Sequence, residues 1–305
     1  MLKTFLSYLI FPGFLFSACA GLIACWIDRK VTARIQWRVG PPWHQNFTDI
    51  IKLLGKETIV PSDSSKWTFL LAPCLGVLGL ILATTIIGRA ALVPQESFLG
   101  DLIVVLYLLI IPAVAMIIAG ASSGNPLASV GVSREMKLVL AYELPFLLSV
   151  TAVIIKCNGA IQFAGILNHQ LNFASNIASF SGILAFVAAL ICMQAKLGLA
   201  PFDISEADQE LMGGVLIEYS GLPLALFKLT KAMLLYTSPL LLIVLFFGKD
   251  LSLLFILLKF VGILVVFILI KNTNPRLRID QALRFFWGPV TLLALLANGL
   301  ALLGY

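Results

Sequence analysis

Eight runs of mainly apolar residues divide this sequence, and few folds can accommodate so many. An α-helix rises about 1.5 Å per residue, so roughly 20 such residues cross a hydrocarbon layer about 30 Å thick. The runs lack the alternating pattern of barrel strands. We predict an all-α integral membrane protein: a single membrane domain, residues 1–305, with about eight transmembrane helices. The predicted spans are residues 5–27, 68–88, 101–120, 137–155, 180–198, 222–247, 251–270 and 283–303.

Composition supports a lipid environment. Of the 305 residues, 60% are hydrophobic and 12% are charged, which is more apolar surface than one soluble core of this length can hide. A basic segment, and no small-residue cleavage site, follows the first run, so we expect a mature helix there and not a signal peptide. The basic residues form no contiguous patch with interleaved aromatics, so we expect no nucleic-acid partner.

Lysine and arginine are distributed unevenly between the loops. If successive loops alternate sides, those after spans 1, 3, 5 and 7, flanks included, hold 14 of the 21 Lys and Arg residues. The N-terminus and the other loops hold 4. By the positive-inside rule, the basic loops face the cytoplasm and both termini face outward. We therefore expect a multi-pass protein of the inner (cytoplasmic) membrane.

The five cysteines show no pattern typical of a metal site. They form no C-x-x-C pair and have no histidine at ligand spacing. We interpret them as small apolar side chains and expect no cofactor or metal in this chain.

The loop after the first span combines basic residues with a short amphipathic stretch. Phe47, Ile50, Ile51 and Leu54 are spaced i, i+3, i+4 and i+7, which predicts a short surface helix. Such a helix either anchors the chain in lipid or forms a docking platform for a peripheral subunit. The predicted docking residues come from this loop and from the last basic loop, whose charges alternatively serve only to set topology. They are Arg29, Lys30, Arg34, Arg38, Arg276 and Arg278.

The loop after the fifth span is acidic. If it is helical, Asp203, Glu206 and Glu210 share one face. Crowded carboxylates repel one another, which raises the pKa of some of them and allows proton exchange. Alternatively, Asp203 and Glu206 are capping and first-turn acids of a helix. Asp208 and Glu218 continue the acidic series toward the sixth span.

Charged residues also lie inside the predicted spans. Each costs about 2.5–3.5 kcal/mol in hydrocarbon and is usually functional or paired. Lys228 and Lys231 share a helical face, so we expect Glu143 or Glu218 to pair with either of them. For Lys259, snorkelling and simple pairing both remain open. The predicted proton or ion path consists of Glu143, Asp203, Glu206, Asp208, Glu210, Glu218, Lys228 and Lys231.

Five segments resemble a known family. They read DRKVTARIQWRVGPPWHQNFTDIIKLLGKE, LGDLIVVLYLL, SREMKLVLAYELPF, APFDISEADQELMGGVLIEYSG and NPRLRIDQ. In the same order, and over most of the chain, they are similar to the eight-helix subunit shared by respiratory complex I (its NuoH-type subunit) and the energy-converting group 4 nickel–iron hydrogenases. The segment GPPWHQNFTDIIKLLGKE is similar to the hydrogenase branch, including formate hydrogenlyase and Ech-type enzymes, whereas complex I members typically read G-P-N-R there.

The resemblance implies a non-catalytic membrane subunit that anchors a peripheral redox arm and couples electron transfer to proton or sodium movement. The implied partners are the hydrogenase large and small subunits, a ferredoxin-like iron–sulfur subunit and antiporter-like membrane subunits. The nickel–iron centre and iron–sulfur clusters belong to these partners. Glu143 in YELPF and Glu218 in EYSG lie in motifs shared with the family.

Two other functions are compatible with parts of the sequence. A complex I subunit would use the loop after the fifth span to shape a quinone chamber, which the hydrogenase relatives do not need. A stand-alone secondary transporter would bind a cation at the acidic loop, but the sequence lacks the inverted repeat expected of such folds.

Overall fold

The computed structural model describes residues 2–93, 97–249 and 252–304; the side chains of residues 2–5 and 208–209 lie outside this description. Within these ranges every regular element is a helix, and none is a strand. The prediction of an all-α protein is therefore confirmed.

Seven helical segments of the described chain are long and apolar enough to cross a membrane, and α9 is a shorter apolar helix. Together they correspond to the eight predicted spans. The helices that build them are α1 (Leu2–Leu9) with α2 (Phe14–Ile35), α4 (Lys66–Leu92), α5 (Asp101–Leu108) with α6 (Ile111–Ser122), α7 (Pro126–Lys156), α9 (Phe180–Lys196), α11 (Gly221–Phe246), α12 (Leu253–Thr273), and α13 (Ile279–Phe285) with α14 (Thr291–Leu302).

Two helices extend beyond their predicted ends into polar sequence. Helix α2 continues to Ile35 instead of ending at 27, and α7 begins at Pro126 instead of 137. The start of α7 is fixed by Asn125, whose side chain accepts a hydrogen bond from the Leu127 N–H at 2.8 Å. Pro126 then occupies the first turn, where its missing N–H costs nothing. Hydropathy alone misplaces these ends because it ignores caps.

Three predicted spans are interrupted. The first divides into α1 and α2 at residues 10–13, which include Pro12. The third divides into α5 and α6, next to Pro112, which lacks an N–H and whose ring crowds the preceding turn. The last contains a π-helical turn at Phe286–Val290, which includes Pro289, between α13 and α14. Each break includes or adjoins a proline, although Pro73, Pro145 and Pro239 lie inside the continuous helices α4, α7 and α11.

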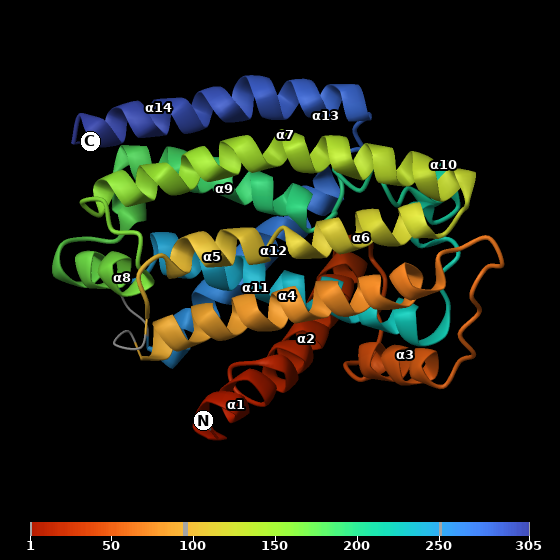
Figure 1. Ribbon diagram of the computed structural model, residues 1–305. Helices are drawn as coiled ribbons and strands as arrows, with labels where there is room; N and C mark the ends of the chain where they lie inside the picture. Colours follow the sequence, from red (N-terminus) through yellow and green to blue (C-terminus); the bar gives the residue numbers. More distant parts are fainter. Residues whose placement is uncertain (1, 94–96, 250–251, 305) are drawn as a thin grey trace.

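The helices form an elongated bundle (Figure 1). Its N- and C-termini lie at one end, with α8 (Phe163–Asn172), and α3 (Gln45–Leu54) and α10 (Asp208–Leu211) lie at the other. Helix α11 is central, with 89% of its most apolar window buried, whereas α12 is peripheral, with 22%. We call the end that carries α3 and α10 the basic end, since the lysine- and arginine-rich loops meet there.

The predicted surface helix is α3, which lies against α2 and α11. Phe47 and Ile50 pack against the core, and the Asn46 amide donates to the Leu22 carbonyl at 2.9 Å. Ile51 and Leu54 stay 66% and 52% exposed. The apolar stripe therefore divides between the bundle and a surface that remains open to lipid or to a partner.

Helices α2 and α11 approach closely at Gly21, where an added side chain would overlap the Ala232 backbone. We predict that Gly21→Leu lowers the free energy of unfolding by about 1–3 kcal/mol, because the backbone of α11 cannot move aside. Gly262→Ala in α12, where an added Cβ meets nothing within 4 Å, is the matched control. Thermal unfolding of the detergent-solubilised protein measures both; equal melting temperatures would contradict this packing.

Candidate functional site

The acidic loop between α9 and α11 is mostly irregular. Its regular parts are α10 and a 3₁₀ turn at Gly214–Leu216. Gly198, Gly213 and Gly214 have φ values of 60°, 99° and 56°, a region that glycine adopts without strain. The prediction that three carboxylates share one helical face is therefore wrong, because Asp203 and Glu206 lie in irregular chain before α10 begins at Asp208.

Each of these three carboxylates instead contacts a cation from a different element. Asp203 Oδ2 lies 2.8 Å from Arg276 Nη2, which follows α12. Glu206 forms an ion pair with Lys231 of α11. Glu210 Oε2 lies 2.7 Å from Arg134 Nη1 of α7. The loop is thus held against three parts of the bundle by charge.

The third of these contacts lies at the surface. The hydrogen bond and the charge of Arg134 hold the pKa of Glu210 below its ordinary value. Because Glu210 is fully exposed, this contact places the loop without burying the charge.

Glu218, the acid that follows the loop, is half-buried. Glu218 Oε1 accepts a hydrogen bond from the Asn125 amide at 2.6 Å, so it lies at the start of α7. Asp208 belongs to α10, and its side chain lies outside the described residues.

Glu143 is the innermost acid of the predicted path. Its Oε1 lies 2.6 Å from Lys196 Nζ, and the two side chains are 15% and 1% exposed. The contact has the distance of an ion pair but not the angles of a hydrogen bond. The Lys196 ammonium also lies 4.8 Å from the Phe146 ring centre and 5.6 Å from that of Tyr142. Two aromatic faces and one carboxylate therefore solvate this buried cation.

The expected lysine pairings are not observed. Glu143 contacts Lys196, and Glu218 contacts Asn125, so neither pairs with Lys228 or Lys231. Lys228 is exposed. The two lysines share a face of α11, but only Lys231 is close enough to the acidic loop to bind a carboxylate.

The positive charge of Lys228 lies close enough to Asp49 on α3 to lower the pKa of its carboxyl group. Partial burial raises the pKa of Asp49, but hydrogen bonds from Arg29 and Gln45 and the charges of Arg29 and Lys228 lower it overall. Lys228 of α11 thus interacts electrostatically with the surface helix α3.

Two adjoining cavities lead inward from the basic end. The outer one has a volume of about 390 Å³ and includes Arg276, Met212 and Ile217 in its lining. The inner one, of about 30 Å³, lies between α6, α7, α9 and α11. Both are lined by Gly198, Asp203 and Glu206. The inner volume has room for one or two water molecules, and the charged side chains on its mainly apolar wall could bind them.

Two oxygen atoms at this junction have no hydrogen-bond partner within the described structure. They are Asp203 Oδ1 and Glu206 Oε1, both buried. Each belongs to a carboxylate whose other oxygen is already held by a cation. Water entering the cavities would find acceptors here, because a buried acceptor without a donor is unfavourable.

Sequence analysis missed three residues of the inner cavity. Glu135 lies just before the predicted start of the fourth span, and Ser205 of the acidic loop lines the same cavity. Lys196 lies at the end of the fifth span, where its charge is attributed to the following loop. The spacing Glu135-x₇-Glu143 was the available signal, since residues eight apart lie near the same face of a helix. Recognising it required the true start of α7.

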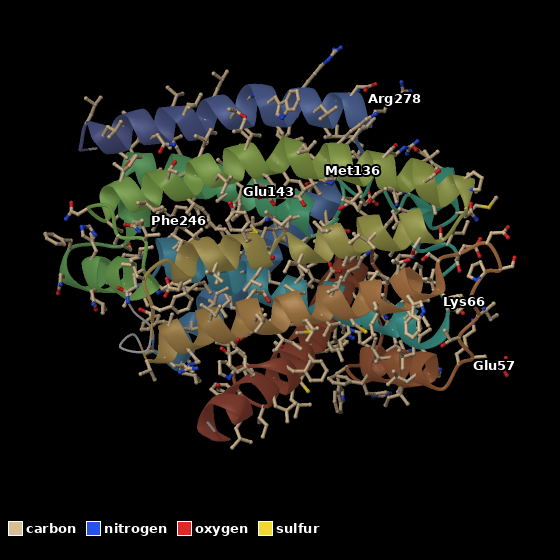
Figure 2. All side chains as sticks on the ribbon, in the orientation of Figure 1. Glu57, Lys66, Met136, Glu143, Phe246 and Arg278 are labelled. Carbon is tan, nitrogen blue, oxygen red and sulfur yellow. The ribbon has the colours of Figure 1, made fainter. Side chains whose placement is uncertain are left out.

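The predicted docking residues gather at the basic end, where Figure 2 labels Glu57, Lys66 and Arg278. Arg34, Arg38 and Arg278 are exposed or nearly so and Lys30 is half-buried, whereas Arg276 is engaged by Asp203. The other docking residue is Arg29. Its Nη1 lies 3.2 Å from Asp49 Oδ2, and this ion pair joins α2 to α3.

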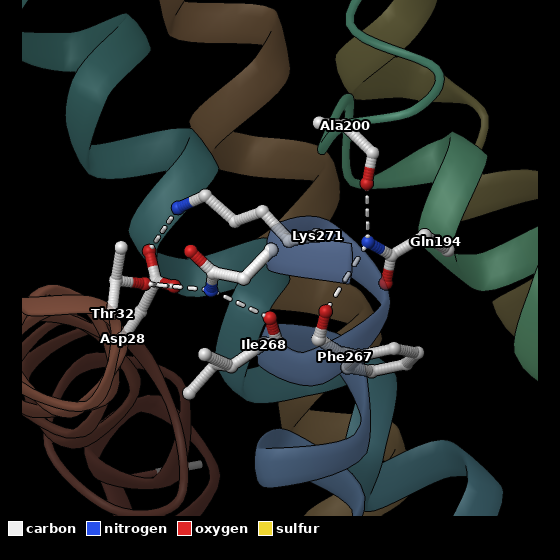
Figure 3. A network of polar contacts seen from close by, with 8 residues as sticks. Asp28, Thr32, Gln194, Ala200, Phe267, Ile268 and Lys271 are labelled. Carbon is white, nitrogen blue, oxygen red and sulfur yellow. Dashed lines mark hydrogen bonds and ion pairs between the residues drawn. The ribbon is translucent and has the colours of Figure 1, made fainter. Parts of the chain in front are cut away.

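Two further contacts fix the position of the basic segment of α2. Lys271 Nζ lies 2.7 Å from Asp28 Oδ2, and the Asn272 amide donates to Thr32 at 3.1 Å, which joins α12 to α2 (Figure 3). In the same view, the Gln194 amide donates to the carbonyls of Ala200 and Phe267. The basic end is thus cross-linked by polar contacts.

Trp37 and Trp43 lie between the basic residues and the surface helix, and they are 98% and 64% exposed. Exposed aromatic residues beside arginines are typical of the central parts of protein interfaces. Within the described residues, no group of three or more His, Cys, Asp or Glu residues is placed to hold a metal ion.

Comparison with known proteins identifies the family. Residues 7–302 match the family described as NADH dehydrogenase. The H subunit of the NADH-quinone oxidoreductase of Thermomicrobium roseum is 33% identical over 329 residues, covering 98% of this chain and 95% of that protein. The corresponding protein of Brevibacillus brevis is 29% identical, covering 93% and 89%.

A solved structure agrees. A chain of the membrane-bound sulfane sulfur reductase, an archaeal respiratory membrane complex, superimposes with a TM-score of 0.88 at 29% identity and covers 98% of this chain and 99% of its own length. The two chains thus share the whole bundle. The protein described here therefore belongs to the NADH dehydrogenase family and is a NuoH-type membrane subunit of complex I-like respiratory complexes.

Proposed function

We propose that this chain anchors a peripheral redox arm at its basic end and carries the coupling of electron transfer to ion movement through the acidic loop and the inner cavity. The observation that carries the proposal is the charged route from Asp203 and Glu206, at the shared cavity wall, to the Lys196–Glu143 pair inside the bundle. Ionisable groups at such depth are costly and usually functional.

The geometry supports a division of roles among the predicted path residues. Asp203, Glu206 and Lys231 line the inner cavity, and Glu143 is reached through Lys196. Glu210 and Glu218 hold the loop in place through Arg134 and Asn125. A redox change in the docked arm would alter the electric field at the loop. The loop carboxylates would then gain or lose a proton, or exchange the cation with which they pair.

We also propose that the arm is a nickel–iron hydrogenase, with large, small and ferredoxin-like subunits that carry the metal centres, and that antiporter-like subunits adjoin the chain in the membrane. The segment around GPPWHQNFTDIIKLLGKE supports this branch. A quinone-reducing complex is the second candidate, favoured by the names of the relatives from Thermomicrobium roseum and Brevibacillus brevis.

Purification of the native complex separates the two candidates. Hydrogen evolution from a reduced ferredoxin, with nickel in the preparation, supports the hydrogenase arm. NADH-dependent quinone reduction by a nickel-free preparation supports the second candidate. Reduction of sulfane sulfur would contradict both and would place the chain with its structural neighbour.

We predict that Glu143→Gln lowers ion translocation per electron at least about tenfold while the complex still assembles, because the amide keeps the shape of the side chain but cannot exchange a proton. Translocation is measured by fluorescence quenching of a pH- or sodium-sensitive dye in sealed vesicles. The control is Glu57→Gln, which changes an exposed acid at the basic end. Because the glutamine variant leaves Lys196 without its counter-ion, Glu143→Asp serves if assembly fails. Normal coupling in Glu143→Gln removes this residue from the path.

We predict that Arg34→Glu combined with Arg38→Glu detaches the peripheral arm, because two positive charges at the surface become repulsive toward an acidic partner. The amount of arm retained on washed membranes is the measurement. Lys249→Glu, a charge reversal at the opposite end of the bundle, should retain the arm. Equal retention by both variants would rule out docking through Arg34 and Arg38.

We predict that the basic end faces the cytoplasm of the inner membrane and that both termini face outward, as the excess of Lys and Arg indicates. In a variant without reactive native cysteines, Ser62→Cys should be labelled by a membrane-impermeant maleimide only in inverted vesicles. Asn158→Cys, at the other end, should be labelled only in right-side-out vesicles. The reverse pattern would invert the proposed orientation.

A further inference from the structure

Glu135 is a buried acid without a cationic partner. It lies on α7, is 7% exposed and belongs to the wall of the inner cavity. Ser205 lies on the same cavity wall. In the part of the chain that the structure describes, no Lys or Arg lies within ion-pair distance of it, unlike Glu143, Glu206 and Asp203.

A carboxylate in this position has two inexpensive states. Burying an unpaired charge is costly, so the side chain either holds a proton or is solvated by water in the cavity. A change in the nearby charges selects between the two. Glu135 is therefore suited to take up and release a proton, whereas an acid locked in an ion pair needs its cation to move first.

The neighbours of Glu135 place it between two ion pairs. The same cavity is lined by Glu206 and Lys231, which pair with each other, and by Lys196, which pairs with Glu143. Glu135 and Glu143 lie eight residues apart on α7, about 12 Å along the helix axis. A proton that moves inward from the loop therefore meets Glu135 before Glu143.

We propose that Glu135 is the proton-carrying residue that links the Glu206–Lys231 pair to the Lys196–Glu143 pair. This inference rests on the proposed function, because it adds a residue to the same path. It does not depend on the identity of the redox arm.

Each step transfers one proton. A proton arriving on Glu206 weakens its hold on Lys231 and passes through a cavity water to Glu135, which becomes neutral while Glu206 is ionised and pairs again with Lys231. The proton then passes from Glu135 through cavity water to Glu143, which becomes neutral and frees Lys196 from its ion pair, while Glu135 is left ionised. Return of Lys196 to Glu143 accompanies loss of that proton toward the partner subunits.

The test uses the purified native complex carrying Glu135→Gln, which keeps the shape of the side chain but cannot ionise. Infrared difference spectra between the oxidised and reduced complex should show the C=O stretch of a protonated carboxylic acid, shifted in D₂O. The band should be absent in Glu135→Gln and present in Glu57→Gln. Ion translocation per electron should fall at least about tenfold in Glu135→Gln and stay unchanged in the Glu57→Gln control.

The results separate this inference from the proposed function. An unchanged band, or unchanged translocation, in Glu135→Gln overturns the role of Glu135 and leaves the proposed function intact. If the unmodified complex moves no ions, the proposed function fails, and the infrared band alone decides whether Glu135 carries a proton. Should Glu135→Gln not assemble, Glu135→Asp must show a shifted band; an unshifted band there also overturns the inference.

Discussion

A lysine buried beside a carboxylate inside a membrane bundle is the constraint on which this structure depends. Lys196 is buried to the level of a core leucine, so its ammonium needs a complete replacement for water. Glu143 supplies the counter-charge, and Tyr142 and Phe146 supply aromatic faces. All three come from α7, which therefore has to lie along α9 in one register.

The acidic loop adapts to the same constraint from the other side. It is anchored by three cations on three elements, so its carboxylates are distributed around a junction of cavities and do not form one face. Two of them each keep one buried oxygen without a partner. The loop is thus held to the bundle by ion pairs, but its two buried carboxylate oxygens lack a hydrogen-bond donor among the described residues. In the proposed function, this combination would admit water and protons while the backbone stays in place.

The span pattern was predictable because hydrocarbon length and apolar composition are local properties of the sequence. The surface helix was predictable for the same reason, from four apolar positions. Pairings were not, because Lys196 and Glu143 are brought together by packing between α7 and α9, which no local pattern reports. Glu135 was not predictable from hydropathy, which begins α7 too late, and the acidic composition of the loop does not reveal that the chain between α9 and α10 is irregular.

The enclosure of α11 affects how the protein responds to its bilayer. Since this helix is surrounded by protein along most of its length, changes in acyl-chain length act on peripheral helices such as α12, which tilt or shift to match the new thickness. Lys231, carried by α11, is shielded from that adjustment. An organism that remodels its lipids with temperature can therefore do so without retuning the electrostatics at the centre of this subunit.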